Sequence, residues 1–232
     1  MNNAPLIEAQ DVHKIYKLGT RKLEVLKGVS MAVEPGEFLA LKGASGAGKS
    51  TLLHLLAGLD SPSSGEIIFQ GNRLNSLSGS ELARLRNSQI GYVFQAYHLF
   101  PELDALENVC LPARISRRPA GAVEKKAQDL LARTGLKDRM DHKPYELSGG
   151  EQQRIAVARA LINKPTIVLA DEPTGNLDSA PGNLVIDLLW QLHEQHDSTL
   201  ILVTHDTALA ARARRILTLQ DGAIVNDTSL AS

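Results

Sequence analysis

The sequence has little of several things that would point to particular classes of protein. Its single cysteine, Cys110, excludes an internal disulfide and a cysteine-based metal cluster, and it fits a reducing compartment. Lysine and arginine total 25 against 26 aspartate and glutamate residues, so the formal net charge is −1. A chain this close to neutrality has no overall field that would draw it to nucleic acid or to an acidic membrane surface.

Long apolar runs are also lacking. The longest, such as TIVLA (166–170) and TLILV (199–203), fall far short of the roughly 20 residues that a membrane-spanning helix needs. The opening residues MNNAPLIEAQ lack the basic start and apolar centre of a signal peptide. We therefore expect no direct membrane insertion, and any role at a membrane would depend on a partner protein.

Short apolar runs separated by helical patterns make up most of the 232 residues, of which 43% are hydrophobic and 22% charged. The strands that this pattern predicts cover residues 37–43, 65–71, 90–95, 166–171, 198–204 and 215–222. The runs at 166–171 and 198–204 are apolar on both faces, as a parallel sheet covered by helices requires. The sequence therefore predicts an α/β fold with a largely parallel central sheet.

Residues 96–161 have a different pattern, with no convincing strand. Within them, residues 119–136 place four apolar side chains on one helical face, and Gly135 is a plausible stop; the four are Val123, Ala127, Leu130 and Leu131. We interpret the chain as one domain over residues 1–232. Its core would be residues 1–95 and 162–232, and residues 96–161 would form an inserted helical subdomain.

GASGAGKST, residues 43–51, matches the phosphate-loop pattern G-x-x-x-x-G-K-S/T between a predicted strand and a predicted helix. Its glycines let the backbone wrap a phosphate chain, with N–H groups directed at the anion. Lys49 suits the β- and γ-phosphates, and the Ser50 hydroxyl suits Mg²⁺. We expect the nucleotide to contact Gly43, Ala44, Ser45, Gly46, Ala47, Gly48, Lys49, Ser50 and Thr51.

TIVLADEP, residues 166–173, supplies two carboxylates directly after a buried strand. The strand would bring Asp171 to the carboxyl edge of the sheet, where open α/β sheets bind ligands. We expect Asp171 to hold the metal ion and Glu172 to act as a general base on water. The alternative is an ordinary acidic loop.

LSGGEQQR, residues 147–154, is a second glycine-rich helix start. Ser148 is a suitable N-cap, and Gly149 and Gly150 expose backbone N–H groups. Taken alone, this segment is either a capped helix or a second anion site, and both interpretations stay open.

Together these motifs resemble the nucleotide-binding subunits of ATP-binding-cassette (ABC) transporters over nearly the whole chain, and LSGGEQQR matches that family's signature motif. The resemblance implies an N-terminal antiparallel β region beside the phosphate-loop core. It also implies that Tyr16 stacks on adenine and that Gln95 in YVFQ reaches the metal and the attacking water. His205 in LVTHD would contact the γ-phosphate, and Asp178 in GNLD would belong to the D-loop.

Each of these residues also has an ordinary interpretation. Tyr16 could be an edge-strand aromatic residue, Gln95 a polar residue at a strand end, and His205 a neighbour of a helix cap. His193 and His196 have a helical spacing that could bind metal, but with no third ligand in view we expect a solvated face.

The resemblance implies an ATPase that binds ATP with Mg²⁺ and works as a homodimer, with each ATP lying between one chain's phosphate loop and the other chain's signature helix. Integral membrane permease subunits would contact residues 96–112, which places the protein peripherally on the cytoplasmic face of a bacterial inner membrane. Three stretches resemble the lipoprotein-releasing and macrolide-efflux branch: residues 58–67, 105–112 and 170–178.

Some alternatives remain. Tyr97, Leu99, Phe100 and Leu103 would either fill the helical subdomain or line a groove for a short helix of a membrane subunit. A soluble cassette ATPase acting on nucleic acid or ribosomes usually has two cassettes or a long coiled-coil insertion. This chain has neither, so we expect no nucleic-acid partner. In a P-loop kinase the signature motif would have no function, so we do not expect a kinase. The motifs do not exclude a regulatory module that binds ATP and in which hydrolysis is secondary.

Overall fold

The structure is a computed structural model that describes residues 4–175, 179–196 and 198–229. The chain divides into two units. The first unit comprises residues 1–86 and 197–232, and the second comprises residues 87–196. The α/β fold class that the sequence predicts, with an antiparallel N-terminal sheet and mostly parallel strands elsewhere, is confirmed.

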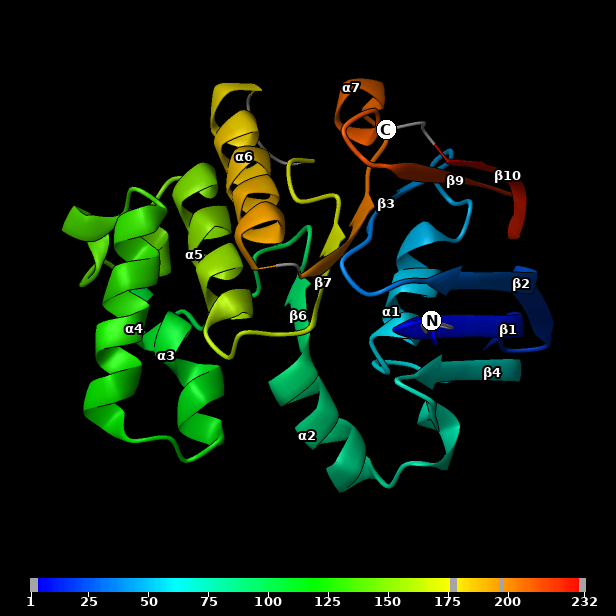
Figure 1. The fold of residues 1–232 in the computed structure, drawn as a ribbon, viewed down its shortest axis with the longest axis horizontal. Helices are drawn as coiled ribbons and strands as arrows, with labels where there is room; N and C mark the ends of the chain where they lie inside the picture. Colours follow the sequence, from blue (N-terminus) through cyan, green and yellow to red (C-terminus); the bar gives the residue numbers. More distant parts are fainter. Residues whose placement is uncertain (1–3, 176–178, 197, 230–232) are drawn as a thin grey trace. The chain divides into compact units, whose positions relative to one another are not determined.

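An antiparallel sheet forms the N-terminal part of the first unit (Figure 1). Its strands run in the order β2 (Arg21–Val33), β1 (Ile7–Leu18), β4 (Ser64–Phe69) and β5 (Asn72–Arg73). The pairing of β1 with β2 shifts register between Ala9 and Val12. Ile7, Ala9 and Val12 are all buried, so the inward-facing set changes phase at that shift.

The same unit contains β3 (Phe38–Lys42), which pairs in parallel with β8 (Thr199–Val203) and β9 (Arg215–Gln220). β10 (Ala223–Ser229) is antiparallel to β9. Every residue of β8 is buried, as its continuous apolar run predicts. Helix α1 (Lys49–Leu56) follows β3 and contacts both β2 and β8, so it lies between the antiparallel sheet and the parallel strands.

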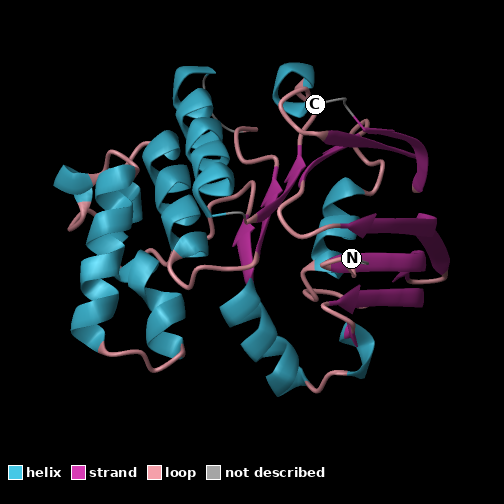
Figure 2. Cartoon of the chain, in the orientation of Figure 1, coloured by secondary structure: helices cyan, strands magenta, loops and turns pink. Residues whose placement is uncertain are grey.

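The second unit is mainly helical (Figure 2). Two parallel strands, β6 (Ile90–Val93) and β7 (Ile167–Asp171), accompany its helices, which are α3 (Ala105–Ile115), α4 (Ala120–Arg133), α5 (Gly149–Leu161) and α6 (Ser179–His196). α5 packs against α3, α4, α6 and β6, and it is therefore the central helix of the unit. Helix α2 (Gly79–Gln89) includes the boundary between the units.

The predicted helical segment is confirmed. The four apolar residues expected on one face of α4 are buried, and Gly135 has a left-handed φ of 71° just beyond the helix. Residues 96–161, all of them described, contain α3, α4, α5 and two short 3₁₀ turns but no strand. The two units divide the chain after residues 86 and 196, whereas the predicted boundaries lie after residues 95 and 161. The predicted core and subdomain stay a prediction. No helix in the described part of the chain is long and apolar enough to cross a membrane.

Candidate functional site

The phosphate loop connects β3 to α1 in the first unit. Gly48, at the N-cap of α1, has a φ of 102°. A Cβ there would lie 2.8 Å from Leu26 Cδ2 and 2.9 Å from the Val25 carbonyl oxygen, both in β2. Only glycine therefore lets the start of α1 approach β2 this closely.

Lys49 extends from the first turn of α1 back to its own loop. The residue is only 5% exposed, and its Nζ donates hydrogen bonds of 3.0 Å to the carbonyl oxygens of Gly43 and Ala44. The loop tip at Ala44, Ser45 and Gly46 is exposed. The ammonium is thus held beside a loop whose outer face is open, as a cation needs to be in order to contact a phosphate bound there.

Tyr16 lies near the end of β1 and contacts the first turn of α1. Its hydroxyl is 2.9 Å from Asp60 Oδ2 and also hydrogen-bonds the Thr51 side chain. Burial and the hydrogen bond to Asp60 raise the pKa of Tyr16. Tyr16 pairs with Leu23 of β2, whereas the ladder between β1 and β4 ends at His13, so both interpretations of Tyr16 remain open.

In the second unit, β7 ends at Asp171, which is 6% exposed. Burial and the charge of Asp171 raise the pKa of Tyr92 on the neighbouring strand β6. Glu172 follows with a left-handed φ of 42°, an unusual conformation for a residue with a side chain. Such strained backbone persists only where the surrounding structure holds it, and it is often found at functional sites.

Gln95 and Glu172 converge on Gly175. A Cβ at Gly175 would lie 3.0 Å from Gln95 Nε2 and 3.4 Å from Glu172 Oε2. The Gly175 N–H donates to the Glu172 carbonyl oxygen at 2.9 Å, which closes the turn that brings the glycine there. The structure therefore brings together an amide and a carboxylate that lie 77 positions apart in the sequence (172 minus 95).

Ser148 is the N-cap of α5 and forms a capping box with Glu151. The Ser148 N–H donates to Glu151 Oε2 at 2.8 Å, and the Ser148 hydroxyl contacts the same oxygen at 2.7 Å. These bonds lower the pKa of Glu151, which also pairs with Arg139 at 3.3 Å. The capped-helix interpretation is thus right for the single chain, and the exposed Ser148 still leaves this helix start accessible.

Known proteins with similar sequences and structures indicate which family has both the phosphate loop and the residues around Glu172 and Ser148. Residues 26–175 match the family model described as ABC transporter, which is more than half of the chain. The chain belongs to the ABC transporter family. The enzyme class predicted from the motifs, an ABC-type ATPase, is confirmed.

Three solved structures are similar to this ABC cassette. A dimeric post-hydrolysis state of the ATP-binding cassette MJ0796, bound to ADP and Pi, has 40% sequence identity and a TM-score of 0.92, covering 97% of this chain and 99% of that one. The dimeric structure of MJ0796 described as a bacterial ABC transporter cassette has 41% identity, a TM-score of 0.92 and the same coverage. cbiO1 from Clostridium perfringens, part of the ABC transporter complex cbiONQ, has 28% identity and a TM-score of 0.84, covering 97% of this chain and 88% of that one.

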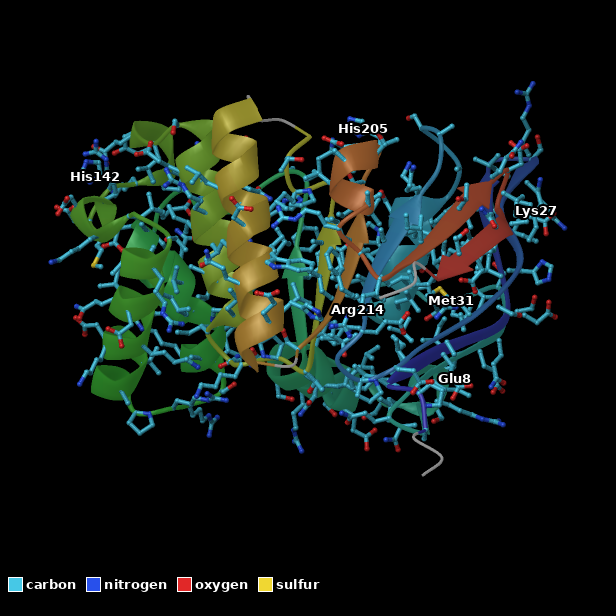
Figure 3. All side chains as sticks on the ribbon, turned by 45° about the horizontal axis from the view of Figure 1, so that its top comes forward. Glu8, Lys27, Met31, His142, His205 and Arg214 are labelled. Carbon is cyan, nitrogen blue, oxygen red and sulfur yellow. The ribbon has the colours of Figure 1, made fainter. Side chains whose placement is uncertain are left out.

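The histidines of this ABC cassette differ in their surroundings. His205 is exposed between β8 and α7 (Thr207–Ala210), as Figure 3 shows, and the cap of α7 is the neighbouring Asp206. Both interpretations of His205 therefore remain open. His193 is 8% exposed and lies 6.0 Å from Trp190 between ring centroids, so the solvated face expected for it is wrong.

Two of the sequence predictions concern residues that the structure does not cover. Asp178 lies outside the described residues, and so does the side chain of His196. Among the side chains that are described, no group of three or more His, Cys, Asp or Glu residues could hold a metal ion. The D-loop role of Asp178 stays a prediction.

Sequence reasoning missed two side chains of α5 that hold the segment around Gln95. Gln153, fully buried, donates from Nε2 to the Phe94 carbonyl oxygen at 3.3 Å. The guanidinium of Arg159 donates to the carbonyl oxygens of Tyr97 at 2.8 Å and His98 at 2.5 Å, and burial lowers its pKa to about 10. The available signal was Arg159, a charged residue within the apolar run that begins at Ile155, whereas Gln153 lies two residues before that run and carries no such signal.

Proposed function

We propose that this ABC ATPase dimerises around two ATP molecules and powers a bacterial inner-membrane complex of the lipoprotein-release, efflux or mechanotransmission type. The observation that carries the proposal is the convergence of Gln95 and Glu172 at Gly175. An amide beside a carboxylate suits the orientation and deprotonation of an attacking water.

In the proposed mechanism, the phosphate loop binds the triphosphate through its N–H groups, and Lys49 neutralises charge on the β- and γ-phosphates. Glu172 accepts the proton of the attacking water. His205, exposed after β8, is proposed to contact the γ-phosphate. The left-handed backbone at Glu172 supports the assignment of Glu172 as the base, because strained residues cluster at functional sites.

Mg²⁺ is the metal that the proposed ligands suit. Ser50, Gln95 and Asp171 offer a hydroxyl, an amide and a carboxylate oxygen, and hard oxygen ligands are those that Mg²⁺ prefers. When bound, Mg²⁺ would neutralise charge on the phosphate oxygens.

The dimer explains why one chain has two glycine-rich helix starts. At the start of α5, a helix of 13 residues, Ser148 is exposed and Gly149 is half-buried, whereas Gly150 is buried, contrary to the expectation that both glycines are exposed. Such a terminus attracts anions, and we propose that it binds the ATP held by the other chain, with Asp178 contributing to the same interface. The dimeric MJ0796 structures support the arrangement by analogy.

Residues 96–112 are proposed to contact integral membrane permease subunits. None of Tyr97, Leu99, Phe100 and Leu103 is fully buried, and Phe100 is 51% exposed, which supports the groove over the core interpretation. The buried Asn108 fixes their backbone, since its Nδ2 donates to the carbonyl oxygens of Phe100 at 3.1 Å and Leu103 at 3.0 Å. Because cbiO1 is part of the ABC transporter complex cbiONQ, its similarity supports a transport assembly. We propose that this chain lies peripherally on the cytoplasmic face of the membrane.

Substitution Glu172→Gln tests the proposal. We expect the variant to bind ATP, to accumulate as a dimer with ATP and Mg²⁺, and to hydrolyse ATP at least about 100-fold more slowly, because the amide cannot accept the proton. Dimer formation is measured by size-exclusion chromatography with light scattering, and hydrolysis by phosphate release.

Glu124→Gln, at an exposed position on α4, is the matched control and should hydrolyse ATP normally without accumulating as a dimer. Parental turnover in Glu172→Gln would remove Glu172 as the base. A variant that stays monomeric with ATP would contradict the nucleotide-bridged dimer and favour a regulatory module.

A further inference from the structure

A lysine and an aspartate from separate parts of the first unit surround Tyr16. Lys14 is only 9% exposed, and its ammonium donates hydrogen bonds of 2.7 Å to Asp60 Oδ1 and to the Ser61 carbonyl oxygen. The same ammonium lies over the Tyr16 ring, 4.9 Å from its centroid. Burying an ammonium is unfavourable unless it is paired, so these contacts define where the lysine must lie.

Both carboxylate oxygens of Asp60 are engaged. Oδ1 accepts from Lys14 and, at 2.7 Å, from the Ser61 N–H, while Oδ2 accepts from the Tyr16 hydroxyl at 2.9 Å. Burial by itself would raise the pKa of Asp60, but the hydrogen bonds from Lys14, Ser61 and Tyr16 outweigh it, and the pKa is lowered. The charged carboxylate therefore anchors the hydroxyl of Tyr16 and the ammonium above its ring at the same time.

The ring of Tyr16 is thereby fixed in two ways. Its hydroxyl is held between Asp60 and Thr51, and Thr51 belongs to the first turn of the phosphate-loop helix α1. Its face is covered on one side by Lys14. A tyrosine on a strand commonly populates more than one χ1 rotamer, and these contacts select one of them.

We propose that Asp60 and Lys14 are positioning residues that hold the Tyr16 ring as a preformed platform for the purine base of the bound nucleotide. Lys14 lies over one face of the ring, and in this proposal the base stacks on the opposite face. The link through Thr51 keeps the platform in register with the phosphate loop. The inference rests on the proposed contact of Tyr16 with adenine and adds how the ring is held before ATP arrives, which preserves affinity that ordering the ring would otherwise remove.

The test compares binding of ATP with binding of inorganic tripolyphosphate, which has no base, by titration calorimetry on the full chain. Asp60→Ala should weaken ATP binding about 3- to 10-fold, because the ring must then be ordered on binding, while tripolyphosphate binding stays unchanged. In steady-state hydrolysis the effect should fall on KM rather than on kcat. Asp60→Asn keeps an oxygen acceptor for Tyr16 and should recover part of the loss.

A double-mutant cycle separates positioning from general structure. If Asp60 acts through the ring, Asp60→Ala should cause no further loss of ATP affinity in a Tyr16→Ala background. Should the alanine at position 60 impair folding, Tyr16→Phe removes the ring's tie to Asp60 and Thr51 without touching Lys14. It should weaken ATP binding to a similar extent and spare tripolyphosphate.

Each contrary result has a distinct meaning. Unchanged ATP affinity in Asp60→Ala and Tyr16→Phe, with a loss in Tyr16→Ala, would overturn the positioning role and leave the platform intact. Equal losses of ATP and tripolyphosphate would also overturn it, since the network would then support the phosphate loop. Unchanged ATP affinity in Tyr16→Ala would instead remove the proposed contact of Tyr16 with adenine, and the inference with it.

Discussion

Lys49 illustrates how a single residue depends on the loop around it. Its side chain is buried, yet its ammonium lies at the carbonyl oxygens of Gly43 and Ala44 beside the exposed loop tip. The spacing of the motif predicts both the residue and its role, because consecutive residues of a strand, loop and helix have little freedom to lie elsewhere.

We expect Lys49→Ala to weaken ATP binding by about 10- to 100-fold, because a charged hydrogen bond to phosphate contributes roughly 1.5–3 kcal/mol. Binding is measured by the fluorescence of an ATP analogue. Lys27→Ala, at an exposed position on β2 that Figure 3 labels, removes a similar charge away from the loop and should bind ATP normally. Equal ATP affinities for the parental protein, Lys49→Ala and Lys27→Ala would contradict the phosphate role of Lys49.

Helix α5 shows how one element connects several parts of the second unit. Its start is capped at Ser148, and its middle holds the segment around Gln95 through Gln153 and Arg159. Beyond its end, the Ile162 carbonyl oxygen accepts a hydrogen bond of 2.5 Å from Lys126 of α4. Burial, together with the charges of Lys164 and Arg118, lowers the pKa of Lys126 from 10.5 to about 8.

This pKa predicts a pH dependence of stability. Between about pH 8 and the ordinary lysine pKa of 10.5, the unfolded chain binds more protons at this position than the folded chain, so stability rises with pH. We expect the parental protein to gain stability relative to Lys126→Met as the pH increases from 7 to 10. Urea midpoints measured on both proteins at each pH test this.

Lys125→Met, at the exposed neighbouring position, is the control, and its difference from the parental protein should vary little with pH. A constant difference between the parental protein and Lys126→Met across the range would show that Lys126 does not titrate there.

At the scale of the whole molecule, the proposed function makes each ATP site the joint property of two chains. Lys49→Ala removes a phosphate-loop contribution, and Ser148→Arg blocks a signature-helix contribution with a bulky side chain at the exposed start of α5. A dimer with one chain of each variant would keep one site in which both contributions are intact.

We therefore expect each variant alone to hydrolyse little ATP at a concentration near the parental KM, and their mixture to recover hydrolysis. Random pairing of equal amounts should restore at most about a quarter of the parental rate, because half of the dimers are mixed and each has one intact site. Phosphate release is measured across mixing ratios. A protein with both substitutions in one chain, mixed with an inactive partner, is the control and should recover nothing. No recovery at any ratio of the single variants would contradict sites shared between chains.

The sequence by itself determined the parts of this protein that depend on neighbouring residues. The phosphate loop, the strand that ends at Asp171, the capped start of α5 and the buried face of α4 follow from local spacing and periodicity. The N-terminal strands were harder to delimit, because the register shift in β1 interrupts the alternation of buried residues that marks a strand.

Only the tertiary structure decided the contacts between distant residues. The meeting of Gln95 and Glu172 at Gly175, the burial of His193 and the hydrogen bond between Lys14 and Asp60 have no counterpart in any local pattern. Polar side chains look alike in a sequence whether water or another residue satisfies them. Which of these occurs depends on the packing of elements far apart along the chain. That packing placed a paired lysine and aspartate at the ring face and the hydroxyl of the tyrosine proposed to receive the base.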